Sequence, residues 1–217
     1  MSDRSYANTV GRALRTAEKW IVHHQEALRS ASRPLRPYLE PFIDGRSPVR
    51  ILDVGAGIVP SVGTVHSTTV IDLVSIDILA CGFRDILAKW NLVPDAFVDY
   101  QDMTVLTFPD ECFDIVHCSN ALDHTASPTA GIREMIRVCV PGGIVYLRHA
   151  KNVGKLERYT GLHQWNIQEA ADHDCLFWTP TERFLLAERF PGFVTHSERP
   201  VPGLEGHRRV VSVLRKP

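Results

Sequence analysis

The apolar positions near the amino terminus of this 217-residue chain recur at helical spacing. Over residues 4–31 they alternate intervals of three and four, which places them on one stripe of a helix. This stripe consists of Val10, Leu14, Ala17, Ile21, His24 and Leu28. Pro34 and Pro37 follow, and proline removes a backbone donor and disfavours helix in the preceding residue. We therefore expect residues 1–45 to form an amino-terminal helical cap.

Short apolar runs then alternate with helical stretches. The apolar runs predict buried strands at Val49–Val54, Thr69–Ile76, Ala96–Tyr100, Phe113–Ser119 and Gly143–Arg148. The intervening stretches predict a helix starting near Val59 or Pro60, then Cys81–Trp90, and then Pro128–Val138 capped by Ser127. Strands and helices that alternate at this spacing predict a mostly parallel sheet covered on both faces.

The last third of the chain has a different pattern. Residues 151–174 are polar and aromatic without a clean period, and Thr179 to Glu182 resembles a capping box that opens a helix to about Phe190. Apolar runs at 194–200 and 208–214 predict a terminal hairpin that adds an antiparallel strand to the sheet. We expect one domain over 1–217, comprising the cap (1–45), a ligand-binding core (49–150), an acceptor or lid segment (151–190) and the hairpin (191–217).

Composition and charge narrow the possible partners. The chain is 44% hydrophobic and 23% charged with a formal net charge of −1, so no overall field recruits nucleic acid. No apolar run reaches the about 20 residues needed to span a bilayer, and the amino terminus has no apolar signal core. The five cysteines include no CxxC pair, which is typical of reduced thiols. We expect a cytoplasmic protein without a membrane span.

The strongest chemical signal is a glycine loop directly after a buried strand. Gly55 and Gly57 let the backbone approach a ligand closely. The next predicted strand ends at Asp77, whose carboxylate is placed to accept hydrogen bonds from ribose hydroxyls. A dinucleotide motif needs a third glycine where this chain has Pro60, and Asp53 would repel a pyrophosphate but suits a cationic ammonium and sulfonium. A tight turn without any ligand is the simplest alternative.

Together, these motifs resemble the class I, Rossmann-like methyltransferases over about residues 49–150. Asp53, Gly55 and Gly57 match the first motif, with Val59 in place of its last glycine. The resemblance implies S-adenosylmethionine as cofactor and a seven-stranded, mostly parallel sheet with an antiparallel carboxy-terminal hairpin strand. It also implies a set of cofactor-binding residues, namely Asp53, Gly55, Gly57, Asp77 at the ribose, Ile78, Asp102 and Met103 near the adenine, and Ser119.

Candidate bases follow the predicted fourth and fifth strands. An aliphatic hydroxyl is a poor nucleophile, so a base contributing about 10²–10⁴-fold is expected if the acceptor is an alcohol. Asp123 and His124 follow one strand and His149 ends the next, at the edge where ligands gather in open α/β sheets. In family members that methylate sugars, a histidine occupies a position similar to that of His124. The alternative is that His124 only caps or packs the following loop.

A mixed aromatic and amide segment provides candidate acceptor contacts, which are Tyr159, His163, Gln164, Trp165 and Asn166. Aromatic faces and amide edges suit a sugar, although a lid that packs Trp165 on the core is equally compatible. With His149 and Asn152, this segment resembles small bacterial methyltransferases of glycan and polysaccharide synthesis. That resemblance implies a hydroxyl of a sugar or short oligosaccharide, such as a methylated mannoside, as acceptor.

Several alternatives stay open at this point. Asp123, Glu157 and His149 could converge on Mg²⁺, although nothing in their spacing shows it. The acceptor could instead be a lipid, quinone or other small molecule, or the chain could bind S-adenosylmethionine without turnover. An NAD-dependent enzyme is disfavoured by Pro60. The amino-terminal stripe fits either a cap on the cofactor cleft or a contact in a homodimer.

Overall fold

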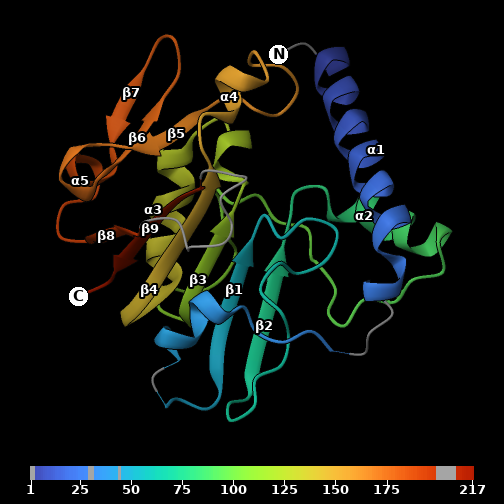
Figure 1. The fold of residues 1–217 in the computed structure, drawn as a ribbon, viewed down its shortest axis with the longest axis horizontal. Coiled ribbons are helices and arrows are strands. Elements are labelled where there is room, and N and C mark those ends of the chain that lie inside the picture. Colours follow the sequence, from blue (N-terminus) through green and yellow to red (C-terminus); the bar gives the residue numbers. More distant parts are fainter. Residues whose placement is uncertain (1–2, 29–31, 44, 199–208) are drawn as a thin grey trace.

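The computed structural model describes residues 3–28, 32–43, 45–198 and 209–217. Figure 1 shows a central sheet flanked by helices, with a smaller sheet beyond the upper end of β4. The helices are α1 (Asp3–Leu28), η1 (Pro37–Phe42), α2 (Ala80–Lys89), η2 (Leu122–His124), α3 (Pro128–Val138), α4 (Val153–Leu156), η3 (Ala171–His173) and α5 (Leu186–Arg189). The strands are β1 (Val49–Val54), β2 (Ile71–Ile76), β3 (Phe113–Ser119), β4 (Cys139–Ala150), β5 (Asn166–Glu169), β6 (Cys175–Trp178), β7 (Arg183–Leu185), β8 (Val194–Glu198) and β9 (Arg209–Arg215).

The described part of the central sheet has six strands in the order β2-β1-β3-β4-β9-β8. Strands β2, β1, β3 and β4 are parallel, whereas β9 pairs antiparallel with β4 and with β8. This arrangement confirms the mixed α/β class and the terminal hairpin, although the residues between its two strands, 199–208, lie outside the described part of the chain. Parallel pairing gathers the carboxyl ends of four strands at one edge of the sheet.

The prediction of seven strands is wrong for the described part of the chain. The expected strand at 96–100 forms only an isolated parallel bridge between Asp99 and Ile76. The side chains of Phe97 and Tyr100 are 57% and 59% exposed, so this segment lacks a continuous apolar face that burial would hold in a ladder. It lies beside the end of β2 without extending the sheet.

The helix predicted near Val59 and Pro60 is also absent, because residues 55–70 form turns and bends. Gly63 has a φ of 87°, which a right-handed helix does not accept. The backbone N–H of Ser61 donates to the Asp53 carboxylate instead of to a helical carbonyl. The hydrogen bond from Ser61 to the buried Asp53 carboxylate therefore takes the place of the first turn of a helix.

The predicted capping box closes a hairpin between β6 and β7. The Oγ1 atom of Thr179 accepts a hydrogen bond from the N–H of Glu182, as in a capped helix. The N–H of Thr179 also donates to the Glu182 carbonyl, however, and the chain reverses there. Phe177 and Phe184 on the two strands stack with ring centroids 4.9 Å apart. Tertiary burial of these rings overrides the local signal, so that only α5 is helical.

Each face of the sheet has its own apolar layer. One face packs against α3 and the small sheet, with Leu52, Val116, Met135 and Phe177 fully buried. The opposite face is covered by the segment around η1, where Leu39 is fully buried. Burying such a side chain contributes roughly 1.5–3 kcal/mol, so both layers stabilise the strands that carry the site.

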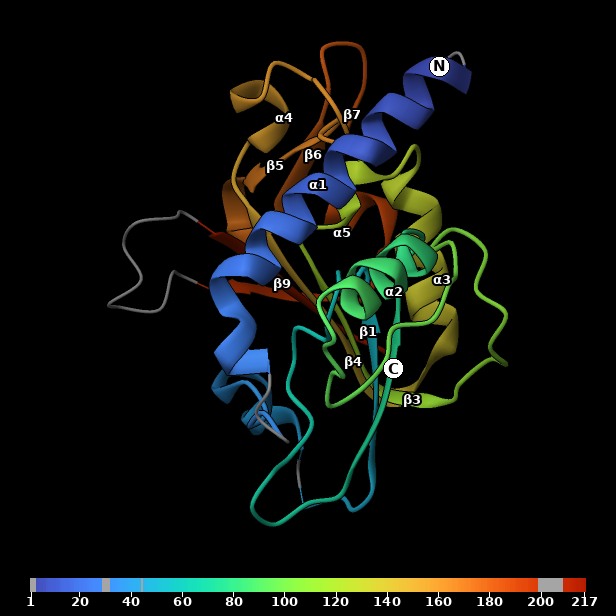
Figure 2. The ribbon, with the colours of Figure 1, turned by 90° about the vertical axis from the view of Figure 1, so that its right-hand side faces the viewer.

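The amino-terminal helix α1 packs on α2, as Figures 1 and 2 show. Ile21 is fully buried in a cluster with Phe83 of α2, and the Leu14 side chain packs against Gly82, where an added Cβ would lie 2.7 Å from it. The stripe residues Leu14, Ala17, Ile21 and Leu28 are thus covered within the chain itself, whereas His24 is exposed. No described helix is both long and apolar enough to cross a membrane.

A side chain at Gly55 should destabilise the fold. A Cβ atom there would lie 2.2 Å from the Cβ of Ala121, and the residue has a φ of 65°. We expect Gly55→Ala to lower the free energy of unfolding by about 3 kcal/mol, combining left-handed strain with overpacking. Gly57→Ala is the matched control, because Gly57 has a φ of 78° and open space around it. It should cost only about 1 kcal/mol. Urea unfolding of both variants checks this, and equal losses would contradict it.

Candidate active site

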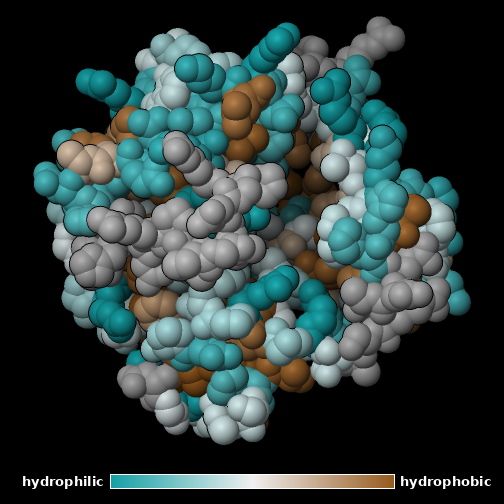
Figure 3. Space-filling view, in the orientation of Figure 1, coloured by the Kyte–Doolittle hydropathy of each residue, from teal (hydrophilic) through white to brown (hydrophobic). Residues whose placement is uncertain are grey.

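The predicted cofactor residues lie together at the carboxyl edge of the sheet. Gly55 follows β1, Asp77 follows β2, and Ser119 ends β3. The surface is hollowed above this edge, between α1 and the α4 region (Figure 3). An open α/β sheet offers its ligands such a position, so the arrangement agrees with the sequence-based prediction.

Asp77 ties the glycine loop to the end of β2. One carboxylate oxygen accepts the N–H of Gly57 at 3.0 Å, and the other accepts the N–H of Leu79 at 2.8 Å. Burial raises the pKa of this carboxyl group, and the two backbone donors only partly oppose that effect. Each oxygen keeps a further lone pair, so Asp77 can also accept hydrogen bonds from two ribose hydroxyls.

The residues expected near the adenine differ in their surroundings. Ile78 is 42% exposed, which leaves its side chain free to cover a ring. Met103 packs against Gly131 and close to Gly55, beneath the loop. Asp102 is exposed, and its Oδ1 atom accepts hydrogen bonds from the backbone N–H and the hydroxyl of Thr104. Its Oδ2 atom makes no recorded hydrogen bond with a described residue.

Asp53 does not face the hollow, contrary to its expected direct contact with the cofactor. Its side chain is fully buried and accepts hydrogen bonds from the N–H of Ser61 at 2.7 Å and its hydroxyl at 3.0 Å. The Nδ1 atom of His117 lies 2.8 Å from the same carboxylate. Asp53 therefore holds the glycine loop in place from its buried side, because all its hydrogen-bond donors are groups of the protein itself.

Sequence reasoning missed the partners of Asp53. His117 is fully buried on β3, directly beside Asp53 in the strand register, and its Nε2 atom lies 3.3 Å from the hydroxyl of Tyr38. With Nδ1–H donated to Asp53, Nε2 accepts from Tyr38. A histidine within the apolar run of β3 was the available signal. Ser61 and Asp53 are on the same side of His117, so these residues do not form a hydrolase triad.

A second polar cluster lies where β3 ends and the segment around residue 163 returns. The Oδ2 atom of Asp123 is 2.7 Å from Nδ1 of His163 and 3.4 Å from Nε2 of His124. The same two nitrogens are 3.1 Å apart. Asp123 is buried, whereas the side chains of His124 and His163 are 31% and 35% exposed. Two predicted catalytic residues and one predicted acceptor residue thus form one site.

The members of this cluster differ in the direction and cause of their pKa shifts. Burial opposes ionisation of Asp123, but the hydrogen bond from His163 and the nearby histidines outweigh it and lower the pKa. The hydrogen bond to Asp123 raises the pKa of His163. Burial lowers the pKa of His124 despite the neighbouring carboxylate. Asp123 and His163 therefore form the more strongly coupled pair.

His149, the third candidate base, is buried at the end of β4 with 2% exposure. Neither ring nitrogen has a hydrogen-bond partner in the described structure. Burial lowers its pKa to about 4, so the ring is neutral at neutral pH. A buried neutral imidazole without partners is costly and marks a position that a ligand atom can satisfy.

Two of the predicted acceptor contacts serve the fold instead. Trp165 is 5% exposed and packs edge-to-face on Phe184, so it belongs to the core. Asn166 is fully buried, and its side chain binds the N–H of Lys155 and the hydroxyl of Tyr159. These contacts correct the prediction for Trp165 and Asn166. Half-buried Tyr159, His163 and Gln164 stay candidates.

A metal ion has one plausible set of ligands among the described residues. Asp123, His124 and His163 each offer a ligand atom, and these atoms all lie within 4.8 Å of one another. Glu157 and His149, which were expected to join a magnesium site, are not in this set. Two imidazoles are poor Mg²⁺ ligands, so the donor set does not support the Mg²⁺ prediction.

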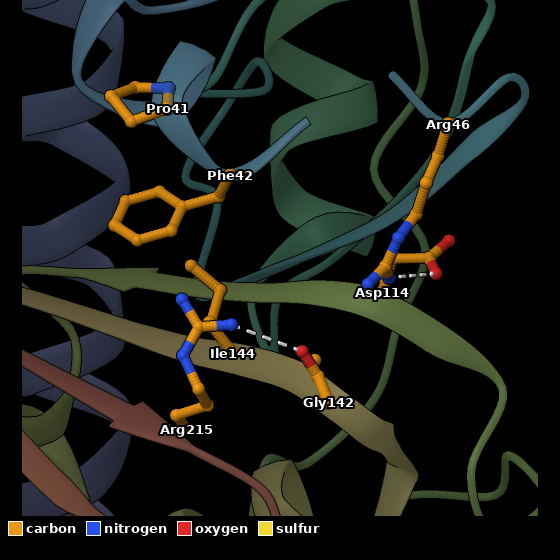
Figure 4. A pocket seen from close by; sticks show the side chains of 8 residues that line it. Pro41, Phe42, Arg46, Asp114, Gly142, Ile144 and Arg215 are labelled. Atoms are coloured by element: carbon orange, nitrogen blue, oxygen red, sulfur yellow. Dashed lines mark hydrogen bonds and ion pairs between the residues drawn. The ribbon is translucent and has the colours of Figure 1, made fainter. Parts of the chain in front are cut away.

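A separate small pocket lies near the opposite ends of β3 and β4 (Figure 4). Arg46 pairs with Asp114 there, and Arg215 donates to the carbonyl of Gly142. Its lining includes none of the predicted site residues. It is lined by Pro41, Phe42, Arg46, Asp114, Gly142, Gly143, Ile144 and Arg215.

Residues 52–147, which run from β1 through β4, match the family model described as a methyltransferase domain. Over these residues the chain is similar to methyltransferase domains. The family implies S-adenosylmethionine, and the loop around Gly55 and Gly57 with Asp77 fits this cofactor because Gly57 adjoins open space and Asp77 keeps free acceptor positions. The comparison with curated proteins found no match to this chain.

Solved structures agree with this assignment of the fold. A chain from the complex between the Haloferax volcanii Trm112 methyltransferase activator and a methyltransferase aligns with a TM-score of 0.56 and 15% identity. That alignment covers 96% of this chain and 97% of the other. A SAM-dependent methyltransferase from Methanosarcina mazei aligns with a TM-score of 0.52 and 16% identity, over 85% and 99%. These methyltransferases share the fold of this chain.

A third structure is similar over part of its length. The chain covers 45% of the [4+2]-cyclase SpnF, which aligns over 53% of this chain at 23% identity with a TM-score of 0.38.

The buried row around Asp53 should be essential for stability. His117→Leu removes a donor from a fully buried carboxylate, so we expect the free energy of unfolding to fall by about 3–5 kcal/mol. Tyr38→Phe removes only the outer hydrogen bond and should cost about 1 kcal/mol. Urea unfolding at pH 7 compares the two variants. A loss in His117→Leu no larger than in Tyr38→Phe would show that His117 does not compensate the charge.

His149 should make the methyltransferase less stable in mild acid. The unfolded imidazole binds a proton below about pH 6.5, whereas the folded one does so only near pH 4. Between these values only the unfolded chain gains the proton, so stability is lost as the pH falls. His149 should contribute about 3 kcal/mol to this loss. Urea unfolding at pH 7 and pH 4.5 should show a smaller loss in His149→Leu than in the unmodified protein, and equal losses would refute the assignment.

Proposed function

We propose that this methyltransferase transfers a methyl group to a hydroxyl, with Asp123 and His163 as the proton-accepting pair. The observation that carries the proposal is the 2.7 Å contact between the Asp123 carboxylate and Nδ1 of His163 at the carboxyl edge of the sheet. A carboxylate on one ring nitrogen fixes the tautomer and leaves the other nitrogen as a base. His163 is one third exposed, so Nε2 is accessible to an acceptor.

When bound, S-adenosylmethionine would supply an electrophilic methyl group, whose bond to sulfur breaks as its bond to the acceptor oxygen forms, with S-adenosylhomocysteine as the leaving group. Gly55, Gly57 and Asp77 would hold it, and the protein gains most from orienting the two reactants, which is worth up to about 7–11 kcal/mol. Nε2 of His163 takes the hydroxyl proton as the acceptor oxygen becomes an ether. Asp123 stabilises the resulting imidazolium, and solvent later removes the proton.

The surroundings of His163 favour a polar acceptor. His124 contacts its ring, and Gln164 follows it in the chain with its amide group bonded to the backbone carbonyls of the preceding loop. These polar groups are as expected for a sugar or short oligosaccharide. His149 adds a neutral ring whose donor and acceptor are both unsatisfied. A methylated mannoside belongs to this acceptor class. A lipid or quinone would instead require mainly apolar lining, so these molecules are the second choice.

Two further features concern the cellular location and the oligomeric state of the enzyme. All five cysteines are free, in agreement with the reducing conditions of the cytoplasm. The apolar stripe of α1 is covered by α2, so a homodimer would need another surface. The competing hypothesis of a protein that binds the cofactor without turnover predicts no role for His163 beyond stability.

The first test is calorimetric titration with S-adenosylhomocysteine and, separately, with NAD. We expect the thioether to bind and NAD not to bind, and Asp77→Ala should abolish the signal. Binding of NAD alone would overturn the assignment of the cofactor.

The second test measures methyl transfer to a panel of glycan acceptors. His163→Gln and Asp123→Asn should lower kcat by about 10²–10⁴-fold while leaving the affinity for S-adenosylhomocysteine within a few-fold. His23→Gln, on the exposed surface of α1, is the matched control and should leave both unchanged. Full turnover in His163→Gln and Asp123→Asn would refute the proposed base.

A further inference from the structure

Three potential ligand atoms converge at the Asp123 cluster. The separations are 2.7 Å between Asp123 Oδ2 and His163 Nδ1, 3.1 Å between the two imidazole nitrogens, and 3.4 Å between Asp123 Oδ2 and His124 Nε2. Ligands held about 2.0–2.2 Å from a tetrahedral or octahedral ion lie roughly 3.0–3.4 Å from one another. Two of the three separations lie in this range and the 2.7 Å separation is slightly shorter, so the triangle is close in size to one face of a coordination sphere.

Hydrogen bonding alone does not satisfy this triangle. If His163 donates its Nδ1 proton to Asp123, the same proton is not directed at His124 Nε2. If His124 also carries its proton on Nε2, two N–H groups approach one oxygen with their nitrogens only 3.1 Å apart. At least one of the three contacts is always unproductive. A cation at their centre would use all three lone pairs.

The neighbouring residue His149 provides a second, independent observation. It is only 2% exposed, and neither of its ring nitrogens has a hydrogen-bond partner in the described structure. It lies near the end of β4, whose neighbour in the sheet, β3, leads into the segment that carries Asp123 and His124. A group bound at the triangle, or a water molecule on such a group, could meet this otherwise unsatisfied ring.

The donor set determines the class of ion. Two imidazoles and one carboxylate suit Zn²⁺, Mn²⁺, Fe²⁺ or Co²⁺, whereas Mg²⁺ and Ca²⁺ prefer oxygen ligands. The partial exposure of His124 and His163 gives an ion a route from solvent. Three protein ligands leave a coordination position open, as in catalytic rather than structural zinc sites.

We propose that Asp123, His124 and His163 bind one divalent first-row transition-metal ion at the acceptor side of the cofactor cleft. The ion would occupy His163 Nδ1 and Asp123, the atoms that orient the proposed base. Metal binding and proton transfer to His163 would then exclude each other, and this consequence alone rests on the proposed function. The binding itself is measured without cofactor or acceptor.

The test uses the full chain after treatment with a chelator and dialysis. Titration with Co²⁺ should produce visible d–d absorption that saturates at one ion per chain, and Zn²⁺ should displace it. His124→Ala and His163→Ala should each weaken Co²⁺ binding by at least about 10-fold. Retained binding of S-adenosylhomocysteine shows that these variants are folded, and it keeps this result separate from a failure of the proposed function.

A control addresses the tandem histidines of α1, which could hold an adventitious ion. The double variant His23→Gln, His24→Gln should keep the absorption and the stoichiometry. Loss of the Co²⁺ signal in this control would overturn the proposal. A Co²⁺ signal that persists in His124→Ala and His163→Ala would also overturn it. The same holds if the unmodified protein shows no saturable Co²⁺ binding.

Discussion

The architecture of the site depends on one buried negative charge. Asp53 has no exposed surface, and a carboxylate removed from water must be compensated by donors from the protein. Ser61 provides two of them and thereby bends the loop after β1, while His117 provides the third from the adjacent strand. The compensation of this charge thus fixes the glycine loop relative to β3, and Gly55 then fits against Ala121 with no room for a side chain.

The loop held in this way joins two half-sites with different chemistry. On one side, Asp77 and the exposed face of Ile78 offer hydrogen-bond acceptors and an apolar surface for a nucleoside. On the other side, Asp123 stands at the end of β3, and the segment returning from α4 brings His163 onto it. Strained backbone accompanies this return, because Arg158 and Tyr159 both have a φ of 54°. The acceptor side is therefore built by tertiary contacts.

The comparisons and the site geometry support different levels of description. The match over residues 52–147 shows similarity to a methyltransferase domain, and the alignments at 15% and 16% identity show a shared fold. Function in such folds depends on which residues lie at the strand ends. The acceptor and the base are accordingly proposed from the His–Asp cluster, which the domain match does not describe.

The sequence by itself determined the elements whose signals are local. Apolar runs located β1 and β3 to the residue, and Ser127 with Pro128 located the start of α3, because burial and capping depend on residues near one another in the chain. The glycine loop and Asp77 were likewise identified from the local sequence pattern. Long-range packing decided the rest. Aromatic burial turned the capping box at Thr179 into a hairpin, and the buried carboxylate of Asp53 replaced the first turn of a helix. The pairing of Asp123 with His163, forty residues apart, depends on a chain reversal that no local pattern encodes.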